Sequence, residues 1–423
     1  MLRRTALSLT LSAAISASAF AANEIDALMT KPEKVGMSTE RLARIGKRMQ
    51  EYIDRNKVAG TVTLVARHGK IVNFEALGYS DREKKIPMKK DDIFVLMSMT
   101  KPIASTALMM QYENGKFLLS DPISKWLPEF AHMQVKAPDG QGGFKLIDAR
   151  PITVRHILTH TAGLPALGSP EARAIAGAKT VRERVKLMAT QPLAFQPGDK
   201  WEYGYATDVV AALAEVLSGQ NMDDYFREHI FKPLGMTDTY YNVPEAKWDR
   251  RPTVYSPKED GTIDPRPRRD PSPTTVFGGV AGLSGTPLDY FRFAQMILNG
   301  GEYNGARILS PKTIDTMISN QIGDGIPVTL KGPGYGFGLG FCVLMDPGKA
   351  AESLTPGTFG WGGAWGTYFF IDPVEDMIGI LAIQITSYRH INIRPDLGTL
   401  AEQAILEPHS SGEQKIRGYA VLH

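Results

Sequence analysis

The order of strand-like and helix-like segments constrains the fold of this chain most strongly. Two apolar segments near the N-terminus, residues 61–66 and 71–77, are joined around His68-Gly69 and predict a β-hairpin. Strand-like segments return only in the last third of the chain, at residues 337–345, 366–371 and 377–385. The sequence between them is mostly helical in its pattern. Strands at both ends with helices between them predict one discontinuous α/β (α+β) domain that carries a mainly helical insert.

Capping residues and helix breakers locate the helices. Ser38 is expected to open a helix to about Arg55, and a second helix begins near Ser98 and ends at Asn114-Gly115. Pro102 fits only the first turn of that second helix, where backbone N–H groups have no helical partner. Further helices are expected after Thr153, from a Thr180/Glu183 capping box, over 206–218 before Gly219, from Asp223 to Phe231 before Pro233, after Thr286 and Ser310, and over 397–406. Loops are expected at residues 138–143, as a hairpin tip, and at the Pro- and Arg-rich run 264–273, as a surface excursion.

The N-terminus has the pattern of a secretory signal peptide. Arg3 and Arg4 precede an apolar, Ser-rich stretch over residues 6–20, which is too short for a membrane anchor. A small-x-small cleavage site ends at Ala21. We therefore expect residues 1–21 to be removed, with no stable membrane anchor left, and the protein to be periplasmic or secreted. General and twin-arginine export both stay open.

Composition argues against several other classes of protein. The 423-residue chain is 43% hydrophobic and 22% charged, and its net charge of +3 gives no indication of nucleic-acid binding. Cys342 is the only cysteine, so no intramolecular disulfide can form, and its apolar neighbours predict a buried strand residue. The eight histidines lack metal-ligand spacing, and His156 and His160 are interpreted as structural. We expect no metal and no cofactor.

Ser98 and Lys101 supply the first chemical signal. Their spacing at a helix start puts both side chains on one face, with Cβ atoms about 5–6 Å apart. A serine hydroxyl becomes a strong nucleophile when a base takes its proton, and a buried lysine amine can be that base. The positive end of the helix dipole favours an oxyanion nearby. Since one Ser-x-x-Lys is expected roughly by chance in such a chain, a helix cap followed by an exposed lysine is the alternative interpretation.

Further segments, found in a fixed order, strengthen that signal. They are Ser98-Met99-Thr100-Lys101-Pro102, residues 153–164 (TVRHILTHTAGL), 197–203 (PGDKWEY), 234–236 (LGM), 279–284 (GVAGLS) and 359–363 (FGWGG). With these segments the chain resembles the serine β-lactamase and penicillin-binding superfamily. Within it, the chain is most similar to the class C-like branch that includes the family VIII carboxylesterases. The resemblance runs from about residue 38 to residue 385.

The resemblance implies a fold and a domain organisation. The expected fold is β-lactamase-like, with a central antiparallel sheet flanked by helices and an inserted, mainly helical subdomain. Residues 22–423 would form a single catalytic domain. Its α/β part would cover roughly 36–100 and 286–410, and its helical subdomain roughly 101–285.

The resemblance also implies roles for individual residues. Ser98 would be the nucleophile, Lys101 its base or proton-sharing partner, and Tyr203 a second base that returns a proton to the leaving group. The lysine and the tyrosine are coupled, so the identity of the general base stays open. The oxyanion hole would consist of the backbone N–H groups of Ser98 and Ala364. Substrate-binding positions are expected at Tyr205, Trp361, Gly362 and Gly363. Two other Tyr-x-Asn strings, which begin at Tyr112 and Tyr240, are interpreted as structural.

Two departures from the lactamase pattern narrow the expected substrate. The tyrosine motif continues as Tyr203-Gly204-Tyr205, without the asparagine that binds a substrate amide in lactamases. Trp361 stands where lactamases carry a lysine that helps to bind a carboxylate, and a neutral indole does not attract that group in the same way. Trp361 and Trp365 are candidates for an apolar acyl pocket, with core packing as the alternative for Trp365.

The sequence therefore predicts a serine hydrolase with an acyl-serine intermediate, most simply a carboxylesterase acting on short-chain esters. Four alternatives stay open: a D-amino-acid peptidase or amidase, a weak β-lactamase, an acyltransferase to an alcohol, and a catalytically dead scaffold of the same fold. The expected partner is a small-molecule ester or amide, with no nucleic acid; the oligomeric state stays open. No Gly-x-Ser-x-Gly elbow is present, which argues against an α/β-hydrolase.

Overall fold

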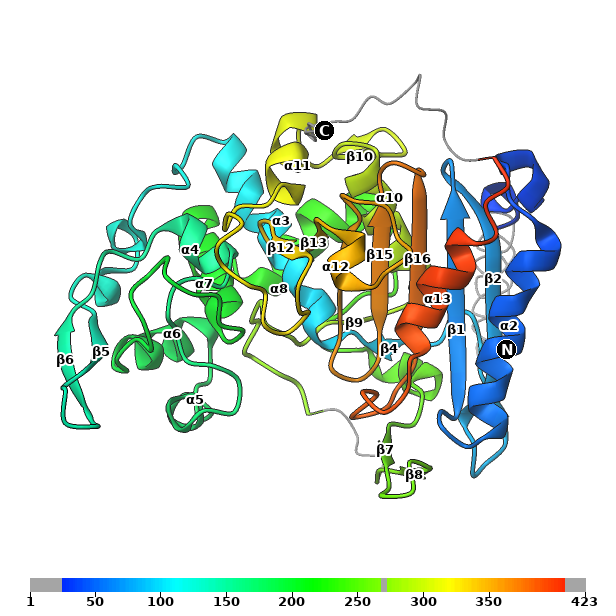
Figure 1. Cartoon of the computed structure of the whole chain (residues 1–423), viewed down its shortest axis with the longest axis horizontal. Helices are drawn as coiled ribbons and strands as arrows, with labels where there is room; N and C mark the ends of the chain where they lie inside the picture. The colour runs from blue at the N-terminus through cyan, green and yellow to red at the C-terminus, as the bar shows by residue number, and fades with distance from the viewer. Residues whose placement is uncertain (1–24, 268–271, 408–423) are drawn as a thin grey trace, which may run out of the picture.

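A computed structural model describes residues 25–267 and 272–407 of the chain. Its main element is an eight-stranded antiparallel sheet in the order β12-β13-β14-β15-β16-β1-β2-β3. The strands are β1 Gly60–Arg67, β2 Lys70–Asp81, β3 Ile86–Pro87, β12 Tyr335–Phe337, β13 Cys342–Leu344, β14 Phe359–Gly362, β15 Tyr368–Asp372 and β16 Met377–Ala382. Strands from the two ends of the chain meet at the β1–β16 pair, where Val62 faces Ala382 (Figure 1). The predicted α/β fold with a central antiparallel sheet is confirmed.

Alternating side chains bury both faces of the central strands. In β1, Val62 and Leu64 belong to the larger core, while Val65 belongs to a second core on the opposite face. In β16, Ile380 and Leu381 divide in the same way. The second core is covered by α2 (Thr39–Asp54) and α13 (Ile393–Glu402), which pack against each other, and the larger core by α10 (Pro287–Leu298). A strand buried on both faces is fixed in register, because a slip of one residue would exchange its two apolar sets.

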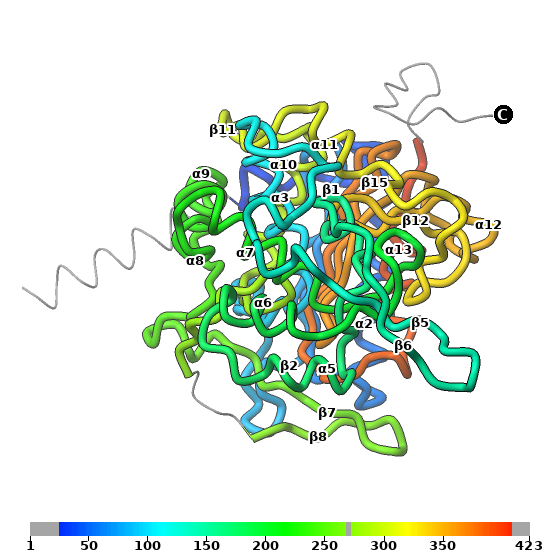
Figure 2. Tube along the Cα trace, turned by 90° about the vertical axis from the view of Figure 1, so that its left-hand side faces the viewer, coloured from blue at the N-terminus to red at the C-terminus, as the bar shows by residue number. Residues whose placement is uncertain are grey.

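The remaining helices form a lobe on one side of the sheet (Figure 1, left). α3 (Thr100–Glu113) is buried along nearly its whole length and packs against α7 (Ala206–Ser218). Around them lie α4 Val154–Leu158, α5 Pro170–Ala174, α6 Val181–Ala189, α8 Met222–Phe226, α9 Lys232–Leu234, and the strands β5 Gln134–Pro138 and β6 Phe144–Asp148. Figure 2 views the molecule from this side and shows the β5–β6 hairpin projecting from the lobe. The hairpin tip expected over residues 138–143 is therefore confirmed.

Smaller elements complete the fold. They are α11 Pro311–Ile318, α12 Pro347–Ala350, β7 Tyr255–Pro257, β8 Ile263–Pro265, β10 Glu302–Tyr303, β11 Ala306–Arg307 and short 3-10 turns at Pro32–Val35, Ile123–Lys125, Pro128–Phe130 and Glu245–Arg250. Capping explains many of the helix starts. Ser38 Oγ accepts from Arg41 N at 3.2 Å at the start of α2, and Thr286 and Ser310 accept in the same way before α10 and α11. The predictions made from these caps are confirmed.

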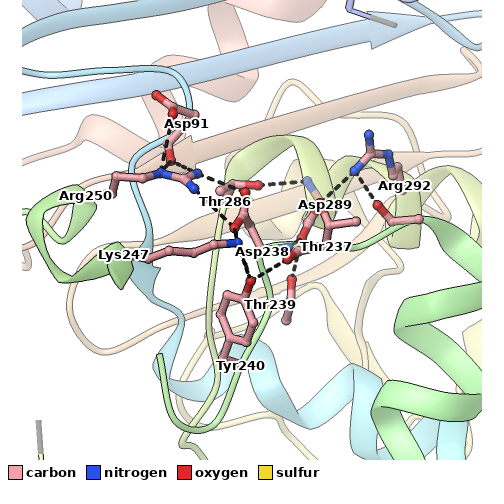
Figure 3. A network of polar contacts seen from close by, with 11 residues as sticks. Asp91, Thr237, Asp238, Thr239, Tyr240, Lys247, Arg250, Thr286, Asp289 and Arg292 are labelled. Carbon is pink, nitrogen blue, oxygen red and sulfur yellow. Dashed lines mark hydrogen bonds and ion pairs between the residues drawn. The ribbon is translucent and has the colours of Figure 1, made fainter. Parts of the chain in front are cut away.

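A buried polar network ties the segment after α9 to α10 (Figure 3). Asp289 on α10 accepts from Asp238 N at 2.7 Å and from Thr239 Oγ1 at 2.9 Å, and it pairs with Arg292 at 2.7 Å. Asp238 in turn pairs with Lys247 and Arg250, at 2.6 and 2.9 Å. Every carboxylate in this network therefore has a cationic partner.

Two helix predictions need correction. Asn221, not Asp223, caps α8, because its Oδ1 accepts from Asp224 N at 3.0 Å. The helix then continues through a π-helical stretch, Arg227–Phe231, and α9, so Pro233 does not end it. The π-helical stretch includes His229, four residues before Pro233. In a regular α-helix the ring of Pro233 would clash with the carbonyl of that residue. The helix ends instead at Gly235, which has a φ of +70°.

Three smaller boundaries also differ. Glu183 accepts from Lys179 N rather than from Thr180 N, so only half of the predicted capping box forms. The last helix begins at Ile393 instead of Leu397. The expected single strand over residues 337–345 is a hairpin of β12 and β13, because Gly340, with a φ of +96°, lets the chain reverse between them.

Some expectations fall outside the described residues. The signal peptide expected over residues 1–21 lies outside them, as does part of the excursion over 264–273. The boundaries between an α/β part and a helical subdomain stay a prediction. Within residues 25–267 and 272–407, none of the helices has both the length and the apolar character needed to span a bilayer.

Candidate active site

Ser98 lies at a strained turn between a short strand and α3. Strand β4 (Phe94–Val95) pairs with β9 (Ser284–Gly285), and the chain then turns through Met97, whose φ is +49°. A positive φ is costly for a side chain such as methionine and persists only where the surroundings enforce it. The turn is a 3-10 segment, Met97–Met99, that leads directly into α3. It presents Ser98, which is 7% exposed, at the start of the helix.

Lys101 lies one helical turn after Ser98, as the spacing predicts. Its Nζ donates to Ser98 Oγ at 3.3 Å and to the carbonyl oxygen of Val280 at 2.9 Å. The side chain is 1% exposed. No carboxylate of the described residues forms an ion pair with it. A buried amine bonded only to neutral oxygens is unusual, because buried charges are normally paired.

The carbonyl that receives Lys101 is itself held by a buried carboxylate. Asp208 Oδ1 accepts from Val280 N at 2.9 Å, and Asp208 Oδ2 pairs with Arg184 Nη1 at 2.8 Å. Asp208 lies in the first turn of α7 and is fully buried. Asp208 was not predicted from the sequence. The available signal was a carboxylate within the otherwise apolar buried run of α7.

Tyr203 lies beside Lys101, as the resemblance implies. Lys101 Nζ is 4.5 Å from the centroid of the Tyr203 ring. The Tyr203 hydroxyl accepts from Trp361 Nε1 at 3.2 Å. Trp361 is only 4% exposed, and its ring also packs against Tyr203 with centroids 5.3 Å apart. Trp361 therefore fixes the phenol, and its expected part in an apolar acyl pocket stays a prediction.

An aromatic cluster supports the other side of Tyr203. The His160 and Trp201 rings lie 5.1 and 5.9 Å from the Tyr203 ring, and Phe337 packs in turn against both of them. Burial, and to a lesser extent the charge of Lys101, holds the pKa of His160 well below its usual range. His160 is therefore neutral near pH 7 and adds no positive charge beside Lys101. His156, in contrast, lies at the start of α4, where its Nδ1 accepts from Thr153 N at 3.2 Å.

The loop after β14 meets the turn before Ser98. Thr367 Oγ1 donates to Leu96 O at 3.1 Å. A Cβ at Gly363 would lie 2.4 Å from the same carbonyl oxygen, so only glycine permits this approach. The contact places Gly363, the residue before Ala364, against the turn that leads into Ser98. Among the described residues, no acceptor takes the backbone N–H of either Ser98 or Ala364, as an oxyanion hole requires.

The structure also gives the surroundings of Tyr205 and Trp365, whose expected roles in substrate binding stay predictions. Tyr205 directly precedes α7, and its N–H donates to Pro165 O at 3.4 Å. Trp365 lines a cavity of about 260 Å³ together with Val95, Thr253 and Gln384. In the Tyr-x-Asn string that begins at Tyr240, the middle residue, Tyr241, is buried, and its hydroxyl donates to Gly278 O at 2.7 Å.

Metal and thiol chemistry find no support in the part of the chain that the structure describes. No group of three or more His, Cys, Asp or Glu side chains there could hold a metal ion. Cys342 is buried in β13, as predicted, and burial raises the pKa of its thiol to about 12. The thiolate, which is the reactive form, is therefore scarce near neutral pH.

The antiparallel sheet, the helical lobe and the Ser98–Lys101–Tyr203 group define a serine hydrolase of the β-lactamase fold. Comparison with known proteins agrees with this class. The sequence matches the Beta-lactamase family over residues 45–395, and the chain belongs to that family. It is an enzyme of the β-lactamase and penicillin-binding superfamily, so the resemblance seen in the sequence is confirmed.

Individual relatives cover most of the chain. Esterase EstB of Burkholderia gladioli is 31% identical over 380 residues, which cover 82% of this chain and 91% of that protein. Protein Rv1367c of Mycobacterium tuberculosis is 32% identical over 357 residues, which cover 79% of this chain and 88% of that protein. Among solved structures, EstCE1, a hydrolase with promiscuous acyltransferase activity, has a TM-score of 0.74 at 28% identity and covers 87% of this chain and 99% of its own. Simvastatin synthase (LovD) of Aspergillus terreus, at 20% identity and a TM-score of 0.73 over 89% of this chain and 99% of its own, shows the same fold.

Proposed function

We propose that this enzyme hydrolyses neutral carboxylic esters, short-chain esters among them, through an acyl intermediate on Ser98. The observation that carries the proposal is the placement of Lys101. Its amine contacts Ser98 Oγ at 3.3 Å while Val280 O holds it from the other side. A nucleophile and a base within hydrogen-bond reach, with a third group that orients the base, are the arrangement that activates a serine.

The proposed reaction has two steps. Ser98 Oγ attacks the ester carbonyl carbon while its proton passes to the Lys101–Tyr203 pair, and the alcohol leaves with that proton. Water then attacks the acyl-serine, gives a proton to the same pair, and the acid leaves as the Ser98 hydroxyl is restored. In both steps the negative charge on the carbonyl oxygen would be received by the N–H groups of Ser98 and Ala364.

Trp361 supports an ester over a substrate that carries a carboxylate. Its indole N–H donates to the Tyr203 hydroxyl, so it orients the phenol and offers no charge to the substrate. The names of two relatives agree with an ester substrate: Esterase EstB, and a lovastatin esterase of Penicillium rubens that is 27% identical over 371 residues. One name supports a second activity, acyl transfer to an alcohol: Acyltransferase calJ of Penicillium decumbens is 28% identical over 338 residues.

Hydrolysis of nitrophenyl acetate and butyrate tests the proposal, with a chromogenic cephalosporin measured in parallel. Ser98→Ala should lower kcat by about 10³-fold or more, because the nucleophile is lost. Ser105→Ala is the matched control, since Ser105 lies on the same helix, is 1% exposed, and its hydroxyl has no partner among the described residues. The control should stay within a few fold of wild type. Full activity in Ser98→Ala would overturn the proposal, and a faster cephalosporin rate would overturn the role given to Trp361.

Acyl transfer is separated from hydrolysis by adding an alcohol to the same assay. A new ester product, formed at the expense of the free acid, would show that the acyl-serine also reacts with alcohols. Ser98→Ala should abolish both products, because both routes share the acyl-serine.

A further inference from the structure

Arg394 is a cation next to the site that the reaction described above does not use. It is the second residue of α13, lies on the face of β14 opposite to Trp361, and is partly buried. Its Nη2 donates to Gly363 O at 2.5 Å and to Thr367 O at 2.6 Å. Its Nη1 donates to the Tyr388 hydroxyl, and the guanidinium stacks on the Tyr388 ring with Cζ 3.7 Å from the centroid. Arginine suits such a site because its planar fork can bind two acceptors while stacking on a ring.

No carboxylate within the described ranges pairs with Arg394. The groups that favour its charged form are phenols, those of Tyr388, Tyr368 and Tyr203, while Arg389 opposes it. Burial lowers the pKa of Arg394 to about 10, so the guanidinium is still a cation at neutral pH. A cation that binds only neutral oxygens makes strong, charge-assisted hydrogen bonds, and it retains a field that no carboxylate cancels.

The two carbonyls that Arg394 binds belong to the two ends of one tight loop. Within the loop, Gly363 N donates to Thr367 O at 2.8 Å and Gly366 N donates to Gly363 O at 3.1 Å. Ala364 lies between these ends. The carbonyl of Gly363 and the N–H of Ala364 are parts of the same planar peptide unit, and in a trans peptide they point in opposite directions.

This shared peptide has a chemical consequence. A donor that fixes the Gly363 carbonyl also fixes the direction of the Ala364 N–H. A cation bonded to the carbonyl oxygen further draws electron density from the amide, which makes the N–H a stronger donor, as in any hydrogen-bonded chain. Room for the guanidinium comes from Gly362, where a Cβ would lie 2.6 Å from Arg394 Cζ.

We propose that Arg394 is a positioning residue for the oxyanion hole, which fixes and polarises the Gly363–Ala364 peptide so that the Ala364 N–H receives the negative charge of the transition state. The inference rests on the proposed acyl-serine reaction. Through this peptide, α13, a helix nearly 300 residues after Ser98, affects the first chemical step.

Arg394→Met, Arg394→Gln and Arg394→Lys test this role in the full-length chain. In stopped-flow hydrolysis of nitrophenyl butyrate, Arg394→Met should lower the acylation rate constant by roughly 10- to 100-fold, less than loss of an oxyanion donor itself. The apparent dissociation constant of the ester should change by less than about threefold, because a neutral ground state carries little charge to stabilise. Affinity for a small alkyl boronic acid, whose adduct with serine carries the negative charge, should fall by the same factor as the rate.

Conservative replacements separate the contributions of charge and hydrogen bonding. Arg394→Lys keeps a cation and should recover part of the rate, and Arg394→Gln, which keeps donors without charge, should recover less. Arg389→Met is the matched control, because it removes an exposed cation from the same segment, and it should leave all constants unchanged. If Arg394→Met does not fold, Gly362→Ala gives a second test, since its Cβ displaces the guanidinium and should lower the same rate constant.

The outcomes distinguish this inference from the proposed function. Wild-type protein with no ester hydrolysis would overturn the proposed function. An active wild type with an unchanged acylation rate and boronate affinity in Arg394→Met would overturn only the role of Arg394. A loss confined to ester binding would also overturn it.

Discussion

Two polar regions of this molecule give their basic side chains different partners: carboxylates in one region and neutral oxygens in the other. In the network of Figure 3, Asp238 pairs with Lys247 and Arg250, and Asp289 pairs with Arg292. Around Ser98, Lys101 instead binds a hydroxyl and a carbonyl, and Arg394 binds two carbonyls and a phenol.

The difference separates stability from function. A charge that is paired in the resting protein holds segments together, and its field is largely cancelled. A buried amine or guanidinium left without a carboxylate costs stability, but its hydrogen bonds remain for the groups that take part in the reaction. We therefore expect substitutions in the two regions to have opposite profiles.

Lys101→Met should show the largest effect on activity. Removing the amine takes away the proposed base, so kcat should fall by about 10³-fold or more. The melting temperature should stay equal to that of wild type or rise, because a buried polar amine without an ionic partner is replaced by an apolar chain of similar length. Thermal unfolding and nitrophenyl ester hydrolysis of the same samples check this. A large loss of stability with retained activity would contradict the comparison.

Asp289→Ala should show the reverse profile. It leaves Arg292, Thr239 and the N–H of Asp238 without their shared carboxylate, so the free energy of unfolding should fall by about 3 kcal/mol. Activity per folded molecule should be unchanged. Urea unfolding followed by fluorescence measures the loss, and Asp249→Ala, at an exposed position of the same segment, is the control. A loss of activity per folded molecule in Asp289→Ala would instead show that the network also serves the active site.

Asp208→Ala tests a residue that has both kinds of contact. Its carboxylate forms an ion pair with Arg184, and it also holds Val280, whose carbonyl is the acceptor for Lys101. Movement of the Val280 carbonyl should lower kcat/KM by about 10- to 50-fold through misplacement of the amine. Asp208→Asn keeps an acceptor for Val280 N and should lose less. Equal losses in both variants would mean that the charge pair with Arg184, not the bond to Val280, matters.

The sequence predicted the parts of the site that follow local rules. Ser98 and Lys101 follow from helix spacing and from Pro102, and Tyr203 from the resemblance. It did not reveal how Lys101 and Ala364 are oriented. Lys101 is held by the backbone carbonyl of Val280, and the peptide of Ala364 is held through the backbone carbonyl of Gly363. Backbone atoms leave no side-chain motif, and the residues that hold them lie far away in the chain.

The same limit applies to the fold. The terminal hairpin and the capped helices were predicted from short-range patterns. The reversal between β12 and β13 was not, because an apolar run with two glycines is compatible with a strand until the packing around it is known. The helix end at Gly235 was missed because a π-helical stretch accommodates Pro233.

The smallest expected effect concerns pH and a carboxyl pair formed by Glu402 of α13 and Asp372 of β15. Burial, and then the neighbouring Asp372, raises the pKa of Glu402 to about 9. The folded state therefore favours protonated Glu402, and the stability from this group is present at low pH and is lost as pH rises from about 4.5 through 9. Glu402→Gln imitates the protonated form, so its melting temperature should exceed that of wild type at pH 8 by a few degrees, roughly 1 kcal/mol, and by less at pH 5. Glu40→Gln, on the exposed face of α2, is the control; an equal gap at both pH values would contradict the assignment.

Labelling with a nitrophenyl alkylphosphonate, followed by peptide mass spectrometry, tests most directly whether Ser98 is the nucleophile. The reagent transfers its phosphonyl group to an activated serine and releases nitrophenol. Wild type and Ser105→Ala should carry one adduct, on the peptide that contains Ser98, with complete loss of esterase activity. Lys101→Met should be labelled far more slowly and Ser98→Ala not at all. An inactivated enzyme whose adduct lies on another residue, or a fully active enzyme with labelled Ser98, would contradict the assignment.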